Sequence, residues 1–331
     1  MKESEIRPQE LFNRYLELSK QDIDRFFSDR SLFREVPCPA CKSEKSRQGM
    51  EKFGFRYLEC LECGSLYLSP RPGVQMFDRY YAESEAVKFW GTDFFKETAE
   101  ARREKMFKPR ARLLAEWVTR CGNNGGVFCD IGSGYGIFLE EVRKLGIFKE
   151  VVGIEPAPNL AAICEDRGFR IIRKKAEDVA AGEVCASFVT AFEVLEHLYD
   201  PAEFLEAIRR ILAPGGLCLF TTLTVSGFDI QVLWEHSKSV YPPHHVNLIS
   251  IEGARRLIER CGLEVEELGT PGELDVDIVA NMVKENPEIV LPRFVRQIVE
   301  NPDEEVRSSF QGFLKAGRLS SHLRAIIRKP S

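Results

Sequence analysis

From about residue 125 onward, short apolar runs alternate with amphipathic helical segments, and this alternation restricts the possible folds more than any other feature of the chain. Strands that alternate with helices predict an α/β fold, in which a doubly wound parallel sheet has helices on both faces. The expected helices span 136–145, 158–167, 201–212 and 251–261. The expected strands span 127–131, 151–155, 169–172, 187–192, 217–222, 263–268 and 322–328.

Length and charge narrow the class of protein. The 331 residues suffice for one large domain or two with a small appendage, and 44% hydrophobic residues can form a sizeable core. The net charge of −5 argues against a strongly basic nucleic-acid-binding protein. The charged N-terminus lacks the apolar run of a signal peptide, and no stretch approaches the ~18 apolar residues of a membrane span. We therefore expect a cytoplasmic protein.

Four of the ten cysteines form two close pairs, Cys38-x2-Cys41 and Cys60-x2-Cys63, with eighteen residues between the pairs. This spacing is typical of a zinc ribbon, in which four thiolates complete a tetrahedral sphere and make the Zn²⁺ structural. Gly64 suits the positive φ that such a turn often needs. A redox dithiol is the alternative. The other six cysteines are expected to be small buried hydrophobes: Cys121, Cys129, Cys164, Cys185, Cys218 and Cys261.

The ribbon itself has a nearly balanced charge. Five basic residues face four glutamates between 38 and 63, which weakens a nucleic-acid-binding interpretation. Phe53, Phe55 and Tyr57 alternate as on a hairpin. We expect the ribbon to pack against the rest of the protein or to cover a substrate.

The chain divides into four segments. We expect a helical segment at 1–35, the zinc ribbon at 36–73, a helical lead-in at 74–124, and the α/β domain at 125–331. The apolar stripe of the first segment predicts packing against the main body, with a partner helix as the alternative. A helical insertion at about 271–317 covers either a substrate pocket or an oligomer interface, and the sequence leaves both open.

A glycine-rich turn with the sequence D-I-G-S-G-Y-G follows the first expected strand, at 130–136. Such a turn normally carries a nucleotide-type ligand at the switch point of the sheet. The dinucleotide fingerprint G-x-G-x-x-G would need glycine at 137, where the sequence has Ile137. The pattern instead resembles motif I of the class I S-adenosylmethionine-dependent methyltransferases. Another nucleotide binder and a plain turn are the alternatives for this motif alone.

Further segments, in order and at family spacing, strengthen the resemblance. It implies a seven-stranded Rossmann-like sheet whose last strand, at 322–328, is antiparallel. Gly132 and Gly134 would admit the methionine end of the cofactor, and Asp130 would hold the turn and the amino group. Glu155, which ends the second strand, would accept both ribose hydroxyls. Other implied cofactor contacts are Tyr135, Gly136, Pro156, Ala176, Glu177 (with Asp178 as the alternative near the adenine), Phe192, Glu193 and Tyr81.

Two of these assignments have structural alternatives. Tyr81 resembles part of an N-terminal aromatic segment that closes over the cofactor, but core packing explains it equally well. Glu196 and His197 resemble the floor of the cofactor site, but a helix cap would use the same residues.

The candidate catalytic residues lie in the insertion after the fifth expected strand. Methyl transfer from a sulfonium is an in-line displacement, and a hydroxyl or acidic C–H acceptor also needs a general base. Histidine suits that role because its pKa lies near neutrality. Tyr241, His244 and His245 are the candidates. The alternative is a loop histidine whose nitrogens are satisfied by backbone carbonyls.

An N-terminal ribbon fused to this domain resembles two groups of enzymes. The first is the deoxysugar C-methyltransferases of surface-polysaccharide clusters, which act on nucleotide sugars. This chain differs from them because His244-His245 replaces their Glu-His and because only about sixty residues follow Pro271. A small sugar-related acceptor, methylated at carbon or oxygen, is therefore expected. The second group, the ribosomal-RNA guanine methyltransferases, and a non-catalytic cofactor-binding scaffold are the alternatives.

Overall fold

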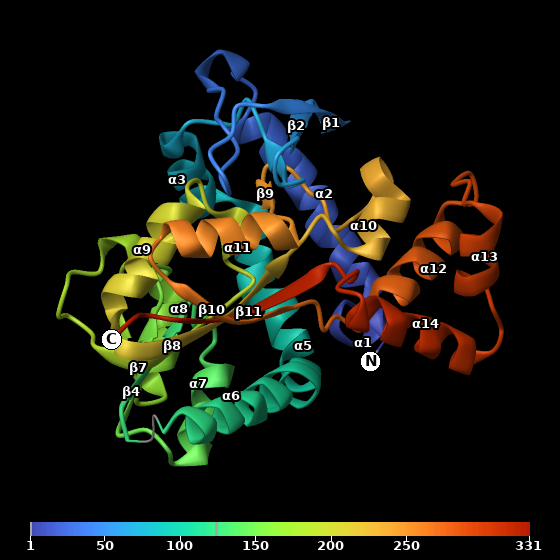
Figure 1. Ribbon diagram of the computed structural model, residues 1–331. Coiled ribbons are helices and arrows are strands. Elements are labelled where there is room, and N and C mark those ends of the chain that lie inside the picture. Colours follow the sequence, from blue (N-terminus) through green and yellow to red (C-terminus); the bar gives the residue numbers. More distant parts are fainter. Residues whose placement is uncertain (1, 123–124) are drawn as a thin grey trace.

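The computed structural model describes residues 2–122 and 125–331. Seven strands form the central sheet in the order β10-β11-β8-β7-β4-β5-β6 (Figure 1). All neighbours from β8 to β6 are parallel, whereas β11 runs antiparallel to both β8 and β10. The doubly wound sheet and its antiparallel last strand are therefore confirmed. The strands are β4 (Val127–Ile131), β5 (Glu150–Ile154), β6 (Arg170–Ile172), β7 (Ala186–Phe192), β8 (Leu212–Leu223), β10 (Glu264–Gly269) and β11 (His322–Arg328).

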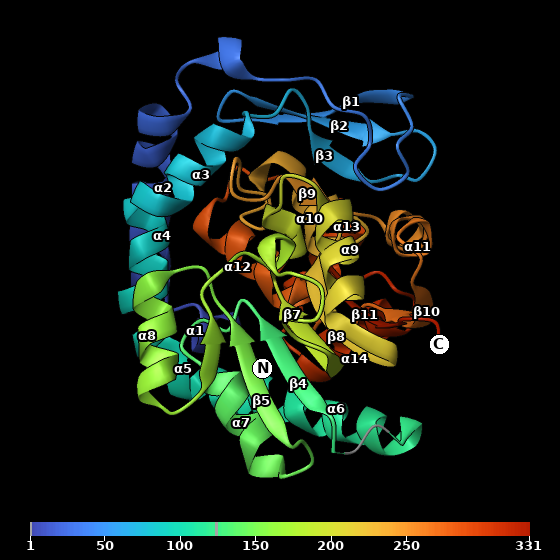
Figure 2. The ribbon, with the colours of Figure 1, turned by 90° about the vertical axis from the view of Figure 1, so that its left-hand side faces the viewer.

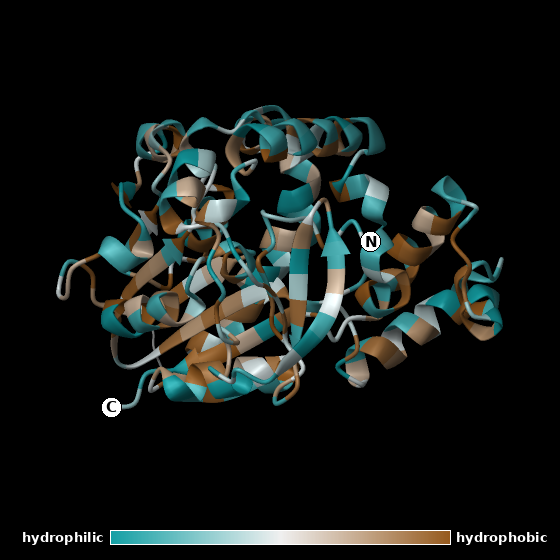
Figure 3. Cartoon of the chain, turned by 90° about the horizontal axis from the view of Figure 1, so that it is seen from above, coloured by the Kyte–Doolittle hydropathy of each residue, from teal (hydrophilic) through white to brown (hydrophobic). Residues whose placement is uncertain are grey.

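Helices cover both faces of this sheet, and their predicted ends are right to within one residue. Along β8, Leu217 and Leu219 join one apolar cluster, while Cys218 and Phe220 join another on the opposite face. This two-residue period sets which face each side chain occupies. Figure 3 shows the resulting apolar strands between more polar helices. One face carries α6 (Lys108–Cys121), α7 (Ile137–Leu145) and α8 (Pro158–Asp166), and the other carries α9 (Pro201–Ile211) and α11 (Ile251–Arg260).

Two details differ from expectation. Strand β8 begins at Leu212, five residues earlier than predicted, because Leu212 already pairs with Ala186 before a bulge shifts the register. Cys185 is exposed in the loop before β7, and Cys121 is half-buried, so the prediction that all six single cysteines are buried was wrong for these two.

The N-terminal helices pack against the main body, as the apolar stripe predicted. Helix α2 ends at Phe26, nine residues before the end of the expected 1–35 segment. Its Tyr15 ring lies 6.2 Å from His244, and its Leu16 carbonyl accepts a hydrogen bond from Tyr241 at 3.0 Å. These helices are α1 (Glu3–Ile6), α2 (Gln9–Phe26), α3 (Val74–Glu83), α4 (Glu85–Phe89) and α5 (Phe95–Arg102), with π-helical turns η2 (Trp90–Phe94) and η3 (Arg103–Phe107).

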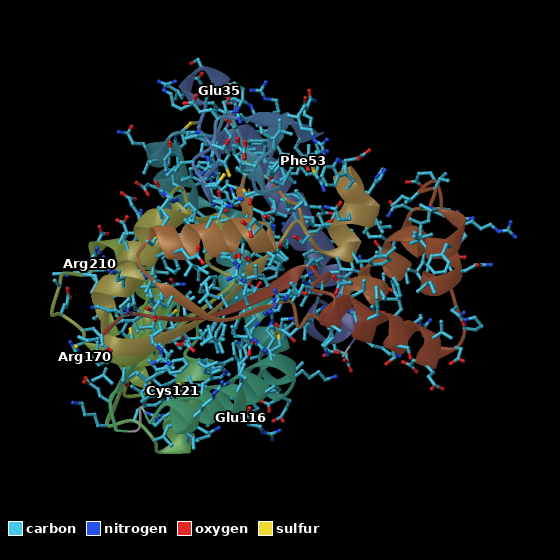
Figure 4. All side chains as sticks on the ribbon, viewed as in Figure 1. Glu35, Phe53, Glu116, Cys121, Arg170 and Arg210 are labelled. Carbon is cyan, nitrogen blue, oxygen red and sulfur yellow. The ribbon has the colours of Figure 1, made fainter. Side chains whose placement is uncertain are left out.

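The cysteine-rich module is joined to the α/β domain by a shared sheet (Figure 2). Its order is β1-β2-β3-β9, and Tyr67 of β3 pairs with Asn247 of β9. Phe53 lies in the turn of the hairpin at φ +51° and not on a strand, which corrects the expected alternation (Figure 4). The module and the insertion after β8 therefore form one packed unit. The strands are β1 (Ser46–Lys52), β2 (Phe55–Cys60), β3 (Leu66–Leu68) and β9 (Asn247–Leu248).

The insertion at 271–317 forms three helices with an apolar cluster of their own. Leu233 of the short helix α10 joins this cluster, and Leu274 and Ile278 face the cavity described below. Within residues 2–122 and 125–331, no helix is long and apolar enough to cross a membrane. The three helices are α12 (Asp275–Glu285), α13 (Arg293–Val299) and α14 (Glu304–Ala316), and α10 spans Phe228–Leu233.

Candidate active site

A cavity of about 920 Å³ lies where β4, β7 and β8 end, at the edge of the sheet where α/β folds bind ligands. Asp130, Gly132 and Gly134 line one part of it, and His197, His244 and His245 line another. The predicted glycine turn and the predicted histidine loop therefore face one space. The N-terminal helices and the helical insertion supply the remaining walls.

The glycine turn exposes its backbone to this cavity. Gly132 and Gly134 have φ values of +74° and +52°, which L side chains rarely adopt. A Cβ on Gly134 would meet no protein atom within 4 Å, so open space lies beside it. A Cβ on Gly136 would lie 2.9 Å from Cys164 Sγ, so this glycine is needed for packing on α8. Gly134 thus leaves a space against the backbone that an added side chain would occupy, whereas a Cβ on Gly132 would lie 3.3 Å from Val194 Cγ2.

Two buried carboxyl groups support the turn. Asp130 is 3% exposed, and its Oδ1 accepts a hydrogen bond from Thr190 Oγ1 at 2.6 Å. Glu155 is 5% exposed, and its two oxygens accept from the backbone N–H groups of Gly134 (2.8 Å) and Ala157 (3.0 Å). Burial raises the pKa of both carboxyl groups. Glu155 therefore lies beside the turn and fixes its conformation.

The wild-type protein is expected to lose stability as pH rises, and replacement of Asp130 by Asn is expected to remove this loss. Burial raises the pKa of Asp130 from 3.8 to about 7, so the folded protein binds a proton that the unfolded chain releases between these values. Stability must then fall as pH rises through this window, by about 3 kcal/mol between pH 5 and pH 8. Urea unfolding at both pH values should show a larger fall in the free energy of unfolding for the wild type than for Asp130→Asn. The amide oxygen of the variant can still accept the hydrogen bond from Thr190. An equal pH dependence in the two proteins would contradict it.

Glu155, Gly136 and several other predicted cofactor contacts lie outside the cavity lining. Tyr135 donates its hydroxyl to the Thr92 carbonyl at 3.2 Å and stacks on Phe95. Pro156 is exposed, Ala176 is buried in the core, and Glu177 is half-buried. Tyr81 lies near His244, with 6.1 Å between the ring centroids, and not at the glycine turn.

Glu193 forms the centre of a polar cluster at the end of β7. It adopts φ +54°, an uncommon backbone conformation that is typical of functional or strained positions. Its Oε1 accepts from Thr221 Oγ1 at 2.6 Å and lies 3.4 Å from both Arg110 and His322. Burial alone would raise the pKa of Glu193, but His322 and Arg110 lower it to about 2. Sequence analysis found Glu193 and Phe192 but missed Arg110 and His322, which come from distant segments.

Three histidines gather at the other end of the cavity. The ring centroid of His197 lies 4.1 Å from that of His244 and 5.0 Å from that of His245. Burial lowers the pKa of all three imidazoles, and that of His245 falls to about 3, so they are neutral at pH 7. His197 Nδ1 donates to the His244 carbonyl at 2.8 Å, and His245 Nδ1 donates to the Ser239 carbonyl at 2.7 Å. These two rings therefore carry their lone pair on Nε2.

Tyr241 lines the same cavity but has its hydroxyl engaged. The hydroxyl donates to the Leu16 carbonyl at 3.0 Å, and burial raises the pKa of Tyr241 to about 12. A phenol with this pKa is a poor source of phenolate at pH 7. Of the predicted candidates, the two loop histidines are better suited to accept a proton.

Side chains of the cysteine-rich module hold the histidine loop in place. Tyr57 of β2 donates its hydroxyl to the His245 carbonyl at 2.7 Å. Buried Arg71 donates to the Tyr199 carbonyl at 2.5 Å and to Asn247 Oδ1 at 3.2 Å. The module thus contacts the loop directly, although the cysteines themselves lie outside the cavity lining.

The four paired cysteines have the geometry of a tetrahedral site. The Sγ atoms of Cys38 and Cys63 lie 3.6 Å apart, and those of Cys41 and Cys60 lie 3.5 Å apart. Four thiolates about 2.3 Å from a zinc ion would lie about 3.8 Å apart, close to these values. Gly64 has φ +72°, as predicted, and Lys42 takes the corresponding positive φ after the first pair. The donor set and its spacing therefore fit Zn²⁺.

Known proteins resemble this chain in the region of the cavity. A family model described as a methyltransferase domain matches residues 99–268, about half of the chain. The C-methyltransferase NovU of Streptomyces niveus is 29% identical over 165 residues, which are 48% of this chain and 38% of that protein. A ubiquinone biosynthesis O-methyltransferase of Cereibacter sphaeroides is 38% identical over 100 residues, which are 28% of this chain and 40% of that protein.

The match thus spans about two fifths of the length of these two relatives. Among solved structures, that of the plantazolicin methyltransferase BpumL in complex with SAH has a TM-score of 0.48 and 12% identity, covering 77% of this chain and 94% of that one.

Proposed function

The chain belongs to the methyltransferase-domain family as a class I S-adenosylmethionine-dependent enzyme, and from this premise we propose that it methylates a small, sugar-related acceptor at carbon or oxygen. One observation carries the proposal: the glycine turn and the histidine loop line the same cavity. A cofactor bound at the turn and an acceptor bound at the histidines would then lie in one cavity, where the methyl group can pass from one to the other.

The turn and its supporting carboxyl groups would hold the cofactor. When bound, S-adenosylmethionine supplies a methyl group that is already activated by its sulfonium sulfur. Gly134 leaves room for a ligand against the backbone, and Gly132 and Asp130 line the same cavity. Glu155 lies next to Gly134, where its carboxylate is suited to the ribose hydroxyls. These residues orient the donor and need no chemistry of their own.

His244 or His245 would remove the acceptor's proton. Each ring is neutral at pH 7 because burial disfavours the imidazolium, so its lone pair can take a proton from a hydroxyl or from a carbon next to a ketone; the same burial makes the ring a weaker base than free histidine. The electron pair released on the acceptor then forms the bond to the methyl carbon, while the sulfur keeps the pair of the broken bond. Tyr241 would position the acceptor beside this pair.

The polar lining supports an acceptor rich in hydroxyls. Glu193 and Thr221 offer hydrogen-bonding groups near the glycine turn. The names of the two relatives span C- and O-methylation, and the chemistry of this cavity is compatible with both.

We further propose that the four-cysteine cluster binds a structural zinc ion. With four protein thiolates, such an ion has no open position for water or substrate.

The basic residues of the ribbon already have partners, which counts against RNA as the acceptor. These contacts are Lys42 with Asp200, Lys45 with Glu62, Arg47 with Glu59, Arg56 with Glu35, and Lys52 with the Ser237 carbonyl.

Replacement of His244 or His245 by Ala tests the proposed base. A panel of nucleotide sugars is incubated with methyl-labelled donor, and kcat is measured on whichever sugar is labelled. Loss of a general base is expected to lower kcat by about 10²- to 10⁴-fold. The affinity for S-adenosylhomocysteine, measured by calorimetry, should remain unchanged because the glycine turn is intact.

His236→Ala is the matched control, since His236 is exposed in the same insertion and lies outside the cavity lining. Labelling of RNA or of phenols with no labelling of any sugar would overturn the assigned acceptor. An undiminished kcat in both histidine variants would overturn the base.

A further inference from the structure

His197, His244 and His245 form a compact group of nitrogen donors that the glycine turn does not use. One ring nitrogen from each lies within 4.8 Å of those of the other two. An ion bound tetrahedrally at about 2.0–2.1 Å would bring such nitrogens to about 3.4 Å from one another. Binding of the ion would therefore require side-chain rotations that bring the nitrogens about 1.4 Å closer together than this limit.

Two of the rings already have the support that metal-binding histidines have. A ligating imidazole almost always donates its other N–H to a carbonyl or carboxylate, which fixes its tautomer and orientation. The Nδ1–H groups of His197 and His245 donate to the backbone carbonyls of His244 and Ser239. Their Nε2 atoms are therefore left with lone pairs, as metal coordination requires.

The third ring has a buried nitrogen without a partner. His244 Nδ1 has no hydrogen-bond partner among the described residues. Burial of such a group unsatisfied costs about 1–3 kcal/mol, and structures usually retain it only where it has another use. A metal ion bound within the cluster would let the His244 ring use a nitrogen as a ligand.

The backbone around the rings is held rigidly, which limits the entropy that binding would cost. The His245 carbonyl accepts from Tyr57, and the Val246 N–H donates to the Glu196 carbonyl at 2.8 Å. Asn247 Nδ2 donates to the Leu198 carbonyl at 2.7 Å, which joins the His197 segment to the loop. The two segments that carry the histidines are thus fixed relative to each other.

From this geometry we propose that His197, His244 and His245 bind one divalent transition-metal ion, such as Zn²⁺, Co²⁺ or Fe²⁺, at the acceptor end of the cavity. Three imidazoles suit such ions and leave a coordination position open toward the cavity.

This inference rests on the proposed function and refines its substrate class. The acceptor would offer the hydroxyl to be methylated to the ion, which lowers the pKa of a bound hydroxyl so that its proton can pass to water. The electron pair left on the oxygen would form the bond to the methyl carbon, while the sulfonium sulfur keeps the pair of the broken bond. A histidine whose lone pair is bound to metal cannot serve as the free base, so metal content decides between the two roles.

Cobalt titration of the protein brought to one zinc per chain tests the site. We expect one further equivalent of Co²⁺ per chain, with visible d–d bands and without the thiolate-to-cobalt charge-transfer band of a cysteine site. His197→Ala and His244→Ala should each weaken this Co²⁺ binding at least 100-fold. His236→Ala, the exposed histidine of the same insertion, should leave it unchanged.

Absence of a second equivalent in the wild type overturns the metal site and needs no variant, so a misfolded variant cannot obscure the result. Cobalt that binds only with a thiolate-to-cobalt band also overturns the metal site, because that ion would have replaced zinc at the cysteines. Calorimetry with S-adenosylhomocysteine is run on the same sample. Retained binding without a second metal leaves the proposed methyltransferase function standing, whereas loss of this binding would contradict the function itself.

Discussion

Gly134→Ala is expected to lower the affinity for S-adenosylhomocysteine at least 100-fold, or by about 2.7 kcal/mol of binding free energy. The added methyl group would meet no protein atom within 4 Å and would project into open space. Gly134 lines the cavity, so this space is where the cofactor is proposed to lie. The loss of affinity would come from a collision with the ligand and not from a rearranged protein.

The substitution also lowers folding stability through backbone strain, and the same substitution at a second glycine measures this effect separately. Alanine at a left-handed position costs about 1–2 kcal/mol of stability. Gly146, which ends α7 at φ +66°, likewise has no atom within 4 Å of the position that a Cβ would take, but it lies outside the cavity lining. Gly146→Ala should therefore lose similar stability in urea unfolding and keep the affinity for S-adenosylhomocysteine. Equal affinities in the two variants would mean that the cofactor does not approach the turn.

The sheet and its helices could be predicted because local patterns determine them. Alternation along β8 places Leu217 and Leu219 on one face, and a two-residue period is visible in any sequence. The glycine turn was equally visible, since its left-handed conformations restrict three positions to glycine within five residues. Both features depend on neighbours in the chain.

The parts that sequence analysis missed depend on contacts between distant segments. Arg110 and His322 meet at Glu193 although they are 212 residues apart. Strand β9 has only two residues, too few for a period, and its pairing with β3 comes from tertiary packing. From the sequence, His197 was equally compatible with the floor of the cofactor site and with a helix cap, because its partners His244 and His245 follow about 47 residues later.

Tyr81 illustrates a different limit. Its aromatic segment resembled a lid over the cofactor, but in the structure Tyr81 lies against Tyr80 and His244. Sequence identifies an aromatic residue near a site, whereas its position relative to the cavity depends on how α3 packs.

Removal of zinc from the ribbon is expected to abolish methyl transfer while leaving cofactor binding intact. Zinc supplies on the order of 10–16 kcal/mol to small cysteine modules, as much as or more than the 5–15 kcal/mol that stabilises a typical domain. Cys60→Ser should therefore lose the ion and unfold β1 to β3. Strand β9 would then lose its partner, and the His245 carbonyl would lose the hydrogen bond from Tyr57.

The expected result is a loss of kcat of at least 100-fold, about 2.7 kcal/mol in the activation free energy. Hydrogen exchange at 244–248 should become faster, and the affinity for S-adenosylhomocysteine should change by less than about threefold. Cys185→Ser, which removes an exposed cysteine outside the cluster, should retain zinc, activity and slow exchange.

Tyr57→Phe tests the support of the histidine loop separately from zinc binding. This variant retains all four cysteines and loses one hydrogen bond to the His245 carbonyl, which is worth about 0.5–1.5 kcal/mol. We expect one zinc per chain by native mass spectrometry together with a fall in kcat of roughly tenfold, because about 1.4 kcal/mol corresponds to a factor of ten in rate. Slow hydrogen exchange at the histidine loop and full activity in zinc-free Cys60→Ser would show that the ribbon has no part in positioning these histidines. The Asn247 contacts alone would then have to hold the loop in place.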